Sequence, residues 1–417
     1  MSVVILTWLS DMRTVVALEH RFVRTPEGNV WTHTQFPYSF WTRYLDVFDS
    51  VLVVARVKDG PSVPSDWKRA DGQYVSFLAV PYYIGPQQFL MRMHQVDRVT
   101  RSSINTADAV ILRAPGNLSG RMYPRLYQVG HPYGVEVVTD PYGNFTSGAI
   151  KHPLNRFFRW YFPRQLRHQC ANACAASYVT QSALQHFYPP SEEAFSTHYS
   201  SIELPTSAFV TTPRPPNQNC GPLTLITVGS LTHLLKAPDI LIRAFSICVL
   251  QKGLDLKLIL IGDGKQRMGL EAQVASLGLS SRVCFQGNLP AGEAVRTQLD
   301  RADVFVLPSR QEGLPRAMIE AMARGLPCIG STVGGIPELI PSEDLVPPND
   351  AMALARTIWD VVTHPERMMR MSARNLKKAK EYEDELLRKR RISFYRSVRK
   401  ETEAWIEMLN TKELVSF

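Results

Sequence analysis

The sequence predicts an α/β protein of two domains, each built on a parallel sheet with helices on both faces. Three observations lead to this fold class. Short apolar runs rich in β-branched residues alternate with helix-like patterns along both halves of the chain, as expected for buried parallel strands and their crossover helices. A proline-rich polar segment separates the two halves. The chain has 417 residues, of which 45% are hydrophobic and 20% charged, which is typical of a globular protein of this size.

The first half contains six expected strands. They are Val15–His20, Val51–Val57, Ser76–Val80, Asp108–Arg113, Val135–Thr139 and Ser177–Thr180. Their apolar residues run continuously instead of alternating with polar ones, which indicates strands that are buried on both faces. We therefore expect residues 1–208 to form an N-terminal Rossmann-like domain, followed by a linker over residues 209–222.

The second half repeats the pattern with five expected strands. They are Leu223–Val228, Lys257–Ile261, Val283–Phe285, Val304–Leu307 and Pro327–Gly330. Residues 223–390 are therefore expected to form a second Rossmann-like domain. Residues 366–410 form a long polar helical stretch, and we expect its end, residues 391–417, to be a helix that returns to the first domain.

Composition excludes several classes of protein and leaves others open. No apolar run approaches the roughly 20 residues that cross a bilayer, and the make-up is not that of a disordered chain or a small disulfide scaffold. The net charge is +9, with 19 basic and 14 acidic groups in residues 1–200 but 14 and 15 in residues 201–365. Such an excess admits nucleic acid, anionic lipid or phosphorylated ligands. All six cysteines are expected to be reduced core thiols of a cytosolic protein: Cys170, Cys174, Cys220, Cys248, Cys284 and Cys328.

Two glycine turns follow strands of the second half. Gly229 and Ser230 end the first strand, and Lys236 follows at the start of a helix pattern. A glycine at a strand end permits a tight turn, and a lysine near a helix N-terminus suits a phosphate, although most such units are plain turns with a surface lysine. Gly262 ends the next strand, where it is either a structural turn or part of a ligand site at the sheet edge.

The segment from Val304 to Gly325 carries the strongest signal. A buried strand is followed by a loop with Glu312 and Gly313 and then by an apolar helix that contains Glu320. The free amides after Gly313 form an expected anion site, and carboxylates accept hydrogen bonds from hydroxyl groups such as those of a sugar or ribose. Glu320 lies among apolar neighbours, where an unpaired carboxylate is costly.

From Leu223 to about Pro347 the chain resembles the retaining nucleotide-sugar glycosyltransferases of glycosyltransferase family 4. The resemblance rests on several motifs in the family's order and spacing: Val228-Gly229-Ser230-Leu231 with Lys236, Ile261-Gly262-Asp263-Gly264, Glu312 and Glu320 in E-x7-E spacing, and Gly334-Gly335-Ile336-Pro337-Glu338. It implies the GT-B fold, in which two Rossmann-like doubly wound domains face each other across a cleft. It also implies that the first domain binds the acceptor and the second binds the nucleotide-sugar donor.

The resemblance assigns roles to individual residues. Lys236 would bind the donor diphosphate, Glu312 would hold hydroxyls of the donor sugar, and Glu320 would hold the ribose hydroxyls. The amides of Gly313 and Leu314 would face the phosphates. The turn at Gly229, Ser230 and Gly262 would complete the donor site, together with Gly28 in the first domain.

The chain departs from the family pattern at three places. Ser230 stands where many members carry a second phosphate-binding arginine, which removes a charge and leaves open how the diphosphate is neutralised; Arg310 or Arg316 could substitute. The glycine loop after the first strand is degenerate, with Gly28 as its candidate. Asp140 is the best match to the family's active-site His or His-Asp after an N-domain strand. It joins Glu312 and Lys236 as a predicted catalytic residue, and His131 and Arg113 are the acceptor-side candidates.

The expected reaction moves a sugar from a UDP- or GDP-sugar to a glycan, a lipid-linked acceptor or a small molecule. Charge on the leaving diphosphate would be stabilised by Lys236 and the helix N-terminus, so neither a metal nor a separate cofactor is expected. Other GT-B enzymes, such as a phosphorylase or a sugar-nucleotide epimerase, and a non-catalytic partner subunit are the alternatives.

A basic and aromatic segment distinguishes the first domain. Lys151 and four arginines of residues 156–167 interleave with Phe157, Phe158, Trp160, Tyr161 and Phe162, with no acid nearby. The pattern fits either a helix that packs its aromatic side chains on the core or a peripheral contact of residues 151–167 with an anionic membrane. The protein is expected in the cytoplasm, with that membrane contact as a hypothesis and without nucleic acid as a partner.

Overall fold

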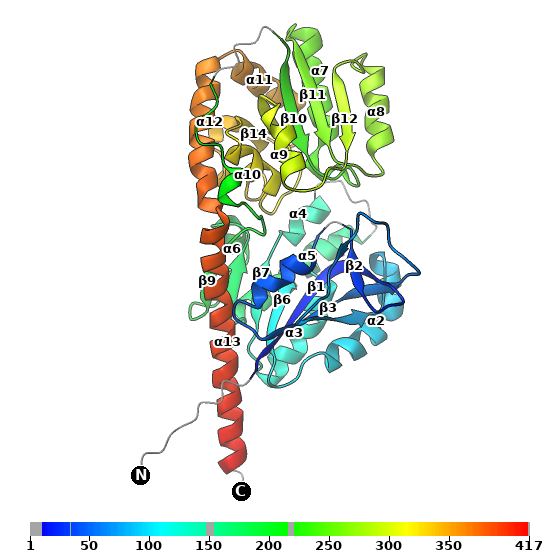
Figure 1. Ribbon diagram of the computed structural model, residues 1–417, viewed down its shortest axis with the longest axis vertical. Helices are drawn as coiled ribbons and strands as arrows, with labels where there is room; N and C mark the ends of the chain where they lie inside the picture. Colours follow the sequence, from blue (N-terminus) through cyan, green and yellow to red (C-terminus); the bar gives the residue numbers. More distant parts are fainter. Residues whose placement is uncertain (1–10, 34, 147–153, 216–220, 416–417) are drawn as a thin grey trace.

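The computed structural model describes residues 11–33, 35–146, 154–215 and 221–415, and it contains two sheets that lie one above the other (Figure 1). The first sheet belongs to the N-terminal half and the second to the C-terminal half. Lys151, Cys220 and residues 216–220 of the expected linker lie outside the described residues.

The first sheet has a parallel centre and a small antiparallel extension. Its path is β4-β2-β1-β6-β7-β8-β9, and β3 and β5 continue the parallel part on the other side of β1. The strands are β1 (Arg13–Arg24), β2 (Val30–Thr32), β3 (Ser50–Asp59), β4 (Lys68–Arg69), β5 (Val75–Val80), β6 (Ala109–Ala114), β7 (Gly134–Val137), β8 (Ala175–Tyr178) and β9 (Phe195–His198). All six strands expected from the sequence are present, which confirms the α/β class of this half.

Short helical segments and longer crossover helices connect these strands. They are α1 (Tyr38–Trp41), the 3-10 turn η1 (Thr42–Tyr44), α2 (Gly85–Ser102), α3 (Asn117–Val129), α4 (Pro141–Thr146), α5 (Asn155–Ala171), α6 (Ala183–Phe187) and η2 (Thr206–Ala208). Alternate residues of β1 divide the core. Val15 and Ala17 join the cluster that contains Val96 of α2, whereas Val16 joins the cluster that contains Tyr395. The cluster with Val15 also holds buried residues of α3 and α5, so α2, α3 and α5 share one face of the sheet.

The second sheet is entirely parallel, in the order β12-β11-β10-β13-β14-β15. Its strands are β10 (Leu223–Val228), β11 (Leu256–Ile261), β12 (Val283–Gly287), β13 (Val304–Leu307), β14 (Cys328–Ser331) and β15 (Leu345–Val346). Its helical segments are η3 (Leu234–Lys236), α7 (Pro238–Ser246), the π-helical turn η4 (Ile247–Gln251), α8 (Arg267–Ser276), α9 (Glu293–Asp300), α10 (Arg316–Ala323), η5 (Ile336–Glu338), η6 (Ser342–Asp344) and α11 (Ala351–Val362).

The C-terminal helical stretch is broken in two. α12 (Pro365–Ala379) packs on the second domain, and α13 (Asp384–Val415) packs on β6, β7, β8 and β9 of the first, so that both helices run along one side of the molecule (Figure 1). The turn η7 (Lys380–Tyr382) separates them. Just after it, Glu383 accepts a hydrogen bond from the Thr206 hydroxyl at 2.7 Å, and the Asp384 amide donates to the Leu204 carbonyl.

These observations correct three details of the sequence analysis. The helix that returns to the first domain begins at Asp384, so the predicted boundary at residue 390 falls inside it. Lys236 does not open a helix, because it ends a 3-10 turn and α7 begins two residues later. Cys284 is exposed on β12 and is not a core thiol. Among the described residues, no helix is both long and apolar enough to cross a membrane.

Candidate active site

The loops that follow β10, β11 and β13 converge at the carboxyl edge of the second sheet. Gly262 has a φ of 134°, and a Cβ there would lie 2.0 Å from the Gly229 carbonyl oxygen. The Gly229 amide in turn donates to the Ile261 carbonyl at 2.9 Å. Only a glycine fits at position 262, so the two predicted glycine turns are parts of one tightly packed backbone surface.

Lys236 and Glu312 meet at this edge. The Lys236 ammonium lies 2.5 Å from both carboxylate oxygens of Glu312, and the Ser309 hydroxyl donates to the same carboxylate at 2.6 Å. The Glu312 residue is only 6% exposed. Since a buried carboxylate requires such partners, Lys236 serves as its counterion.

Arg310 holds the turn that carries Lys236. Its guanidinium makes two hydrogen bonds of 2.7 Å to Asp239, and it donates to the Leu234 carbonyl at 2.6 Å. Arg310 is thereby committed to positioning the loop, and it is not free to replace the arginine that is missing at Ser230. The Ser230 hydroxyl instead caps its own turn by accepting from the Thr232 amide at 3.2 Å.

The loop with Glu312 and Gly313 rests on a second pair of glycines. A Cβ on Gly334, which has a φ of 54°, would lie 2.2 Å from the Glu312 carbonyl oxygen. The Gly335 amide donates to the Gly313 carbonyl at 2.7 Å. In the described part of the chain, the amides of Gly313 and Leu314 have no hydrogen-bond acceptor.

The same loop touches the first domain. A Cβ on Gly313 would lie 2.4 Å from the carbonyl oxygen of Val138, just after β7. The Gln311 side-chain amide donates to the Asp140 carbonyl at 2.9 Å. The carboxyl edges of the two sheets therefore face each other, and Asp140 lies beside the loop that carries Glu312.

Glu338 makes the most extensive of these contacts between the domains. Its carboxylate accepts hydrogen bonds from the amides of Gln181, Ser182 and Ala183 at 2.6, 2.9 and 2.7 Å, and from the Ser182 hydroxyl at 3.0 Å. A carboxylate of the second domain therefore caps α6 of the first. Such a charged cap satisfies free amide donors and interacts favourably with the helix dipole.

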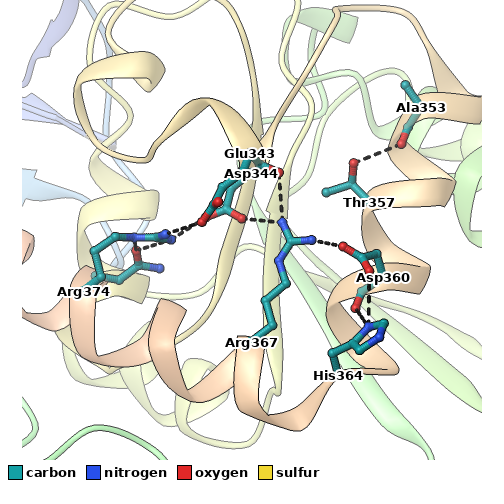
Figure 2. Close-up of polar contacts among 9 residues, drawn as sticks. Glu343, Asp344, Ala353, Thr357, Asp360, His364, Arg367 and Arg374 are labelled. Carbon is teal, nitrogen blue, oxygen red and sulfur yellow. Dashed lines mark hydrogen bonds and ion pairs between the residues drawn. The ribbon is translucent and has the colours of Figure 1, made fainter.

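The segment that carries Glu338 is anchored in its own domain by Asp344. Figure 2 shows this carboxylate between Arg367 and Arg374 of α12, with Asp360 of α11 on the far side of Arg367. Asp344 is fully buried, so the two guanidinium groups supply the partners that a buried charge requires. These ion pairs of Asp344 fix the chain six residues after Glu338 and so help to position the Glu338 carboxylate at the start of α6.

The Asp140 carboxylate is already engaged within the first domain. It accepts hydrogen bonds from the amides of Tyr142 and Gly143 at 2.9 and 3.1 Å and from the Tyr188 hydroxyl at 2.5 Å. Burial, together with this bond to Asp140, raises the pKa of Tyr188. The contacts give the Asp140 carboxylate a positioning role at the start of α4.

Glu320 lies inside α10, as the sequence analysis predicted. Burial raises the pKa of this carboxyl above its usual range, and the positive charges of Arg316 and Arg296 oppose that shift in part. No hydrogen bond to its carboxylate is present among the described residues.

The other predicted residues lie in the first domain. Gly28 is in the turn between β1 and β2, and a Cβ there would meet nothing within 4 Å. His131 precedes β7, whereas Asp140 follows it, so the two lie at opposite ends of one strand. The His131 ring packs at an angle against Trp405 with ring centres 4.4 Å apart.

Arg113 lies near the carboxyl end of β6 and pairs with Glu136 of β7. Burial lowers the pKa of Arg316 of α10, and the positive charge of Arg113 adds to that shift, so Arg113 faces the second domain.

Sequence reasoning missed three residues that build the site. Ser309 binds Glu312, Gln311 reaches Asp140, and Glu338 joins the domains. Glu338 ends a motif that the resemblance includes, but nothing in the sequence indicates its partner more than 150 residues away. Across the described ranges, no cluster of three or more His, Cys, Asp or Glu side chains is arranged to hold a metal ion.

We expect Glu338→Ala to loosen the contact between the domains. The substitution deprives three amides of a charged acceptor, which costs about 0.5–2 kcal/mol as for other helix caps, and it shifts the population toward a more open arrangement. Small-angle X-ray scattering would show this as a larger radius of gyration. Glu343→Ala is the matched control, because Glu343 lies on the same segment but pairs with Arg374 inside its own domain. Superimposable curves for both variants would contradict the role of the cap.

We also expect Glu320→Gln to stabilise the fold at neutral pH. A raised pKa means that the folded protein binds this proton more tightly than the unfolded chain, so ionisation costs stability above the folded pKa. The variant should therefore have a higher free energy of unfolding than the wild type at neutral pH. This difference should shrink as the pH falls toward 4.5, the usual pKa of a glutamate carboxyl. Urea unfolding at both pH values tests this, with exposed Glu407→Gln as the control. A pH-independent difference would contradict it.

Comparison with known proteins agrees with the geometry. Residues 211–378 match the model of a family described as Glycosyl transferases group 1. The chain is 25% identical to protein CapJ of Staphylococcus aureus over 329 residues, which is 78% of this chain and 80% of that protein.

Solved structures resemble the whole chain. Sucrose-phosphate synthase of Thermosynechococcus elongatus superposes with a TM-score of 0.69 at 19% identity, over 93% of this chain and 99% of that one. Anabaena HepE in complex with UDP-glucose superposes with a TM-score of 0.59 at 16% identity, over 96% of this chain and 100% of that one. The predicted GT-B fold is therefore confirmed, and the match of residues 211–378 to the Glycosyl transferases group 1 model, together with the curated relatives, supports an enzyme that transfers glycosyl groups.

Proposed function

We propose that the protein is a retaining glycosyltransferase of family 4 that transfers a sugar from a UDP- or GDP-sugar. One observation carries this proposal: the ion pair between the half-buried Lys236 and the buried Glu312 lies where the carboxyl edges of both sheets meet, beside the amides of Gly313 and Leu314. A donor bound there would offer its diphosphate to Lys236 and to the amides, and its sugar hydroxyls to Glu312. The bound UDP-glucose of HepE, which has the same fold, supports a nucleotide-sugar donor.

Charge development on the leaving diphosphate explains the proposed mechanism. As the bond from the sugar to the phosphate breaks, negative charge on the phosphate grows, and Lys236 stabilises it with the amides of Gly313 and Leu314. Lys236 is then shared between the diphosphate and Glu312, which retains the Ser309 hydroxyl. Glu320, whose carboxylate has no partner among the described residues, is proposed to bind the ribose hydroxyls.

The proposed roles of the first domain are to bind the acceptor and to hold the donor loop. Asp140 contributes through its carbonyl, which binds Gln311 next to Glu312, while its carboxylate orders α4. Contact across the domains would limit water at the reacting sugar and so favour transfer over hydrolysis.

We expect Lys236→Ala and Glu312→Ala each to lower the release of nucleoside diphosphate by about 10²–10³-fold, as when one group that stabilises a transition state is removed. The assay measures this release over a panel of UDP-, GDP- and ADP-sugars, which also identifies the base and the sugar. Lys252→Ala, an exposed lysine of the same domain, is the control. Equal turnover in all four proteins would contradict the assignment of the site.

We further propose that the acceptor is lipid-linked and that the enzyme contacts an anionic membrane through the first domain. α2, α3 and α5 together contain nine arginines and a single acidic residue, Asp97. These helices share one face of the sheet, and Met91 and Trp160 are exposed on them. Exposed apolar side chains among cations are typical of proteins that lie on a membrane surface.

We expect the protein to float with vesicles that contain phosphatidylglycerol and not with vesicles of phosphatidylcholine alone. The double change Arg156→Glu and Arg164→Glu on α5 should lower the bound fraction at least about tenfold, since each basic residue near such a surface contributes about 1 kcal/mol. Arg370→Glu with Lys377→Glu on α12 makes the same charge change on the other domain and should leave flotation unchanged. Binding that is insensitive to salt and to lipid charge would contradict the membrane contact.

A further inference from the structure

The first domain contains a cavity of about 620 Å³ between α2, α3 and α5. Its walls are largely apolar and come mainly from α2 and α5: Phe89, Leu90, Met93, Phe157, Phe158 and Tyr161. The aromatic segment that the sequence analysis singled out therefore does not simply pack on the core, because part of it lines an open cavity. A cavity with such walls favours an apolar ligand.

The polar floor of this cavity is built around Glu19. Glu19 accepts hydrogen bonds from the Tyr83 hydroxyl at 2.6 Å and from the Leu118 amide at 3.0 Å, and it pairs with Arg56 at 3.1 Å. Arg56 also donates to the Tyr83 carbonyl at 2.9 Å, while its buried Nε has no acceptor among the described residues. A cationic ligand group would have to displace the partners of Glu19, so the apolar walls are the larger part of what this cavity offers a ligand.

The cavity lies next to the donor loop. Pro141 forms part of its wall, and the preceding residue, Asp140, accepts the hydrogen bond from Gln311 at 2.9 Å. Glu312 follows Gln311 directly. The cavity wall at Pro141 is therefore linked through Asp140 to Gln311, the residue before the predicted sugar-binding carboxylate.

The rim of the cavity fits a membrane lipid. Leu90 is 59% exposed although it lines the cavity, and its neighbour Met91 is 85% exposed on the same helix. The arginines of α2, α3 and α5 surround this apolar surface. Apolar side chains that continue from the cavity to an exposed and positively charged surface match a lipid with a long chain and an anionic headgroup.

We propose that this cavity binds the hydrocarbon chain of a membrane-lipid acceptor and thereby presents its headgroup to the donor site. The inference rests on the proposed glycosyl transfer and specifies the class of its acceptor. It assigns α2 and α5 a role in choosing the substrate, in addition to any attraction between the arginines and the membrane.

A homologous series of n-alkyl phosphates, from hexyl to dodecyl and below their micelle concentrations, tests the proposal by calorimetric titration of the full chain. Affinity should rise about fourfold for each added methylene group while the chain still fits the cavity. Leu90→Asp places a charge on the cavity wall and should weaken binding of the decyl compound at least about tenfold. Met91→Asp makes the same charge change on the next residue of the helix, outside the cavity lining, and should bind as the wild type does.

Affinity that is independent of chain length would overturn the proposal. An equal loss in Leu90→Asp and Met91→Asp would also overturn it, because the amphiphile would then bind the outer surface of α2. The test is separable from that of the proposed function, since the titration uses no nucleotide-sugar. If alkyl phosphates bind more tightly as the chain lengthens, but Lys236→Ala keeps full turnover of the donor, only the proposed function is contradicted. If Lys236→Ala loses turnover, but alkyl phosphates do not bind the protein, only the proposed role of the cavity is contradicted.

Discussion

The ion pair between Lys236 and Glu312 is the interaction on which the rest of the site depends. The Glu312 carboxylate is buried and needs this cation, because the loss of the half-buried Lys236 would leave a buried charge without a counterion. The chain fixes both partners by backbone packing. Arg310 clamps the turn that carries Lys236, and Gly334 lets the backbone lie against Glu312. Loops from separate strands thus form one rigid edge, to which the first domain is attached.

Much of the fold could be predicted because parallel strands leave long apolar runs. β1, β3 and β10 are of this kind, whereas β2, β4 and β15 have only two or three residues and β9 is short and largely exposed, so none of them carries a recognisable apolar run. The Lys236 and Glu312 positions could be predicted because each follows a strand end at a fixed spacing. The cap of Glu338 on α6 could not, because its geometry exists only once both domains are folded and docked. His131 shows the converse error, since proximity in sequence placed it near Asp140 although a strand separates them.

The two domains are joined by contacts of different kinds. On one side, Glu338 and Gln311 provide a few directed hydrogen bonds at the edges of the sheets. Along the side of the molecule, α12 and α13 bridge both domains, with the turn η7 between them (Figure 1). A domain motion must break the hydrogen bonds but need only bend the chain at η7. The two domains are thus connected by the helical segment from α12 to α13 and by a small set of hydrogen bonds that can break and re-form.

The positive face of the first domain is built from arginine, and α2, α3 and α5 contain no lysine. A guanidinium group stays protonated at any pH at which the protein is folded, and it is less strongly hydrated than an ammonium group. In the proposed membrane contact, the attraction of this face for phosphate groups would therefore be insensitive to alkalinity and to acetylation. Counterions and competing phosphates would weaken it, so the anionic lipid content of the membrane would govern how much enzyme binds there.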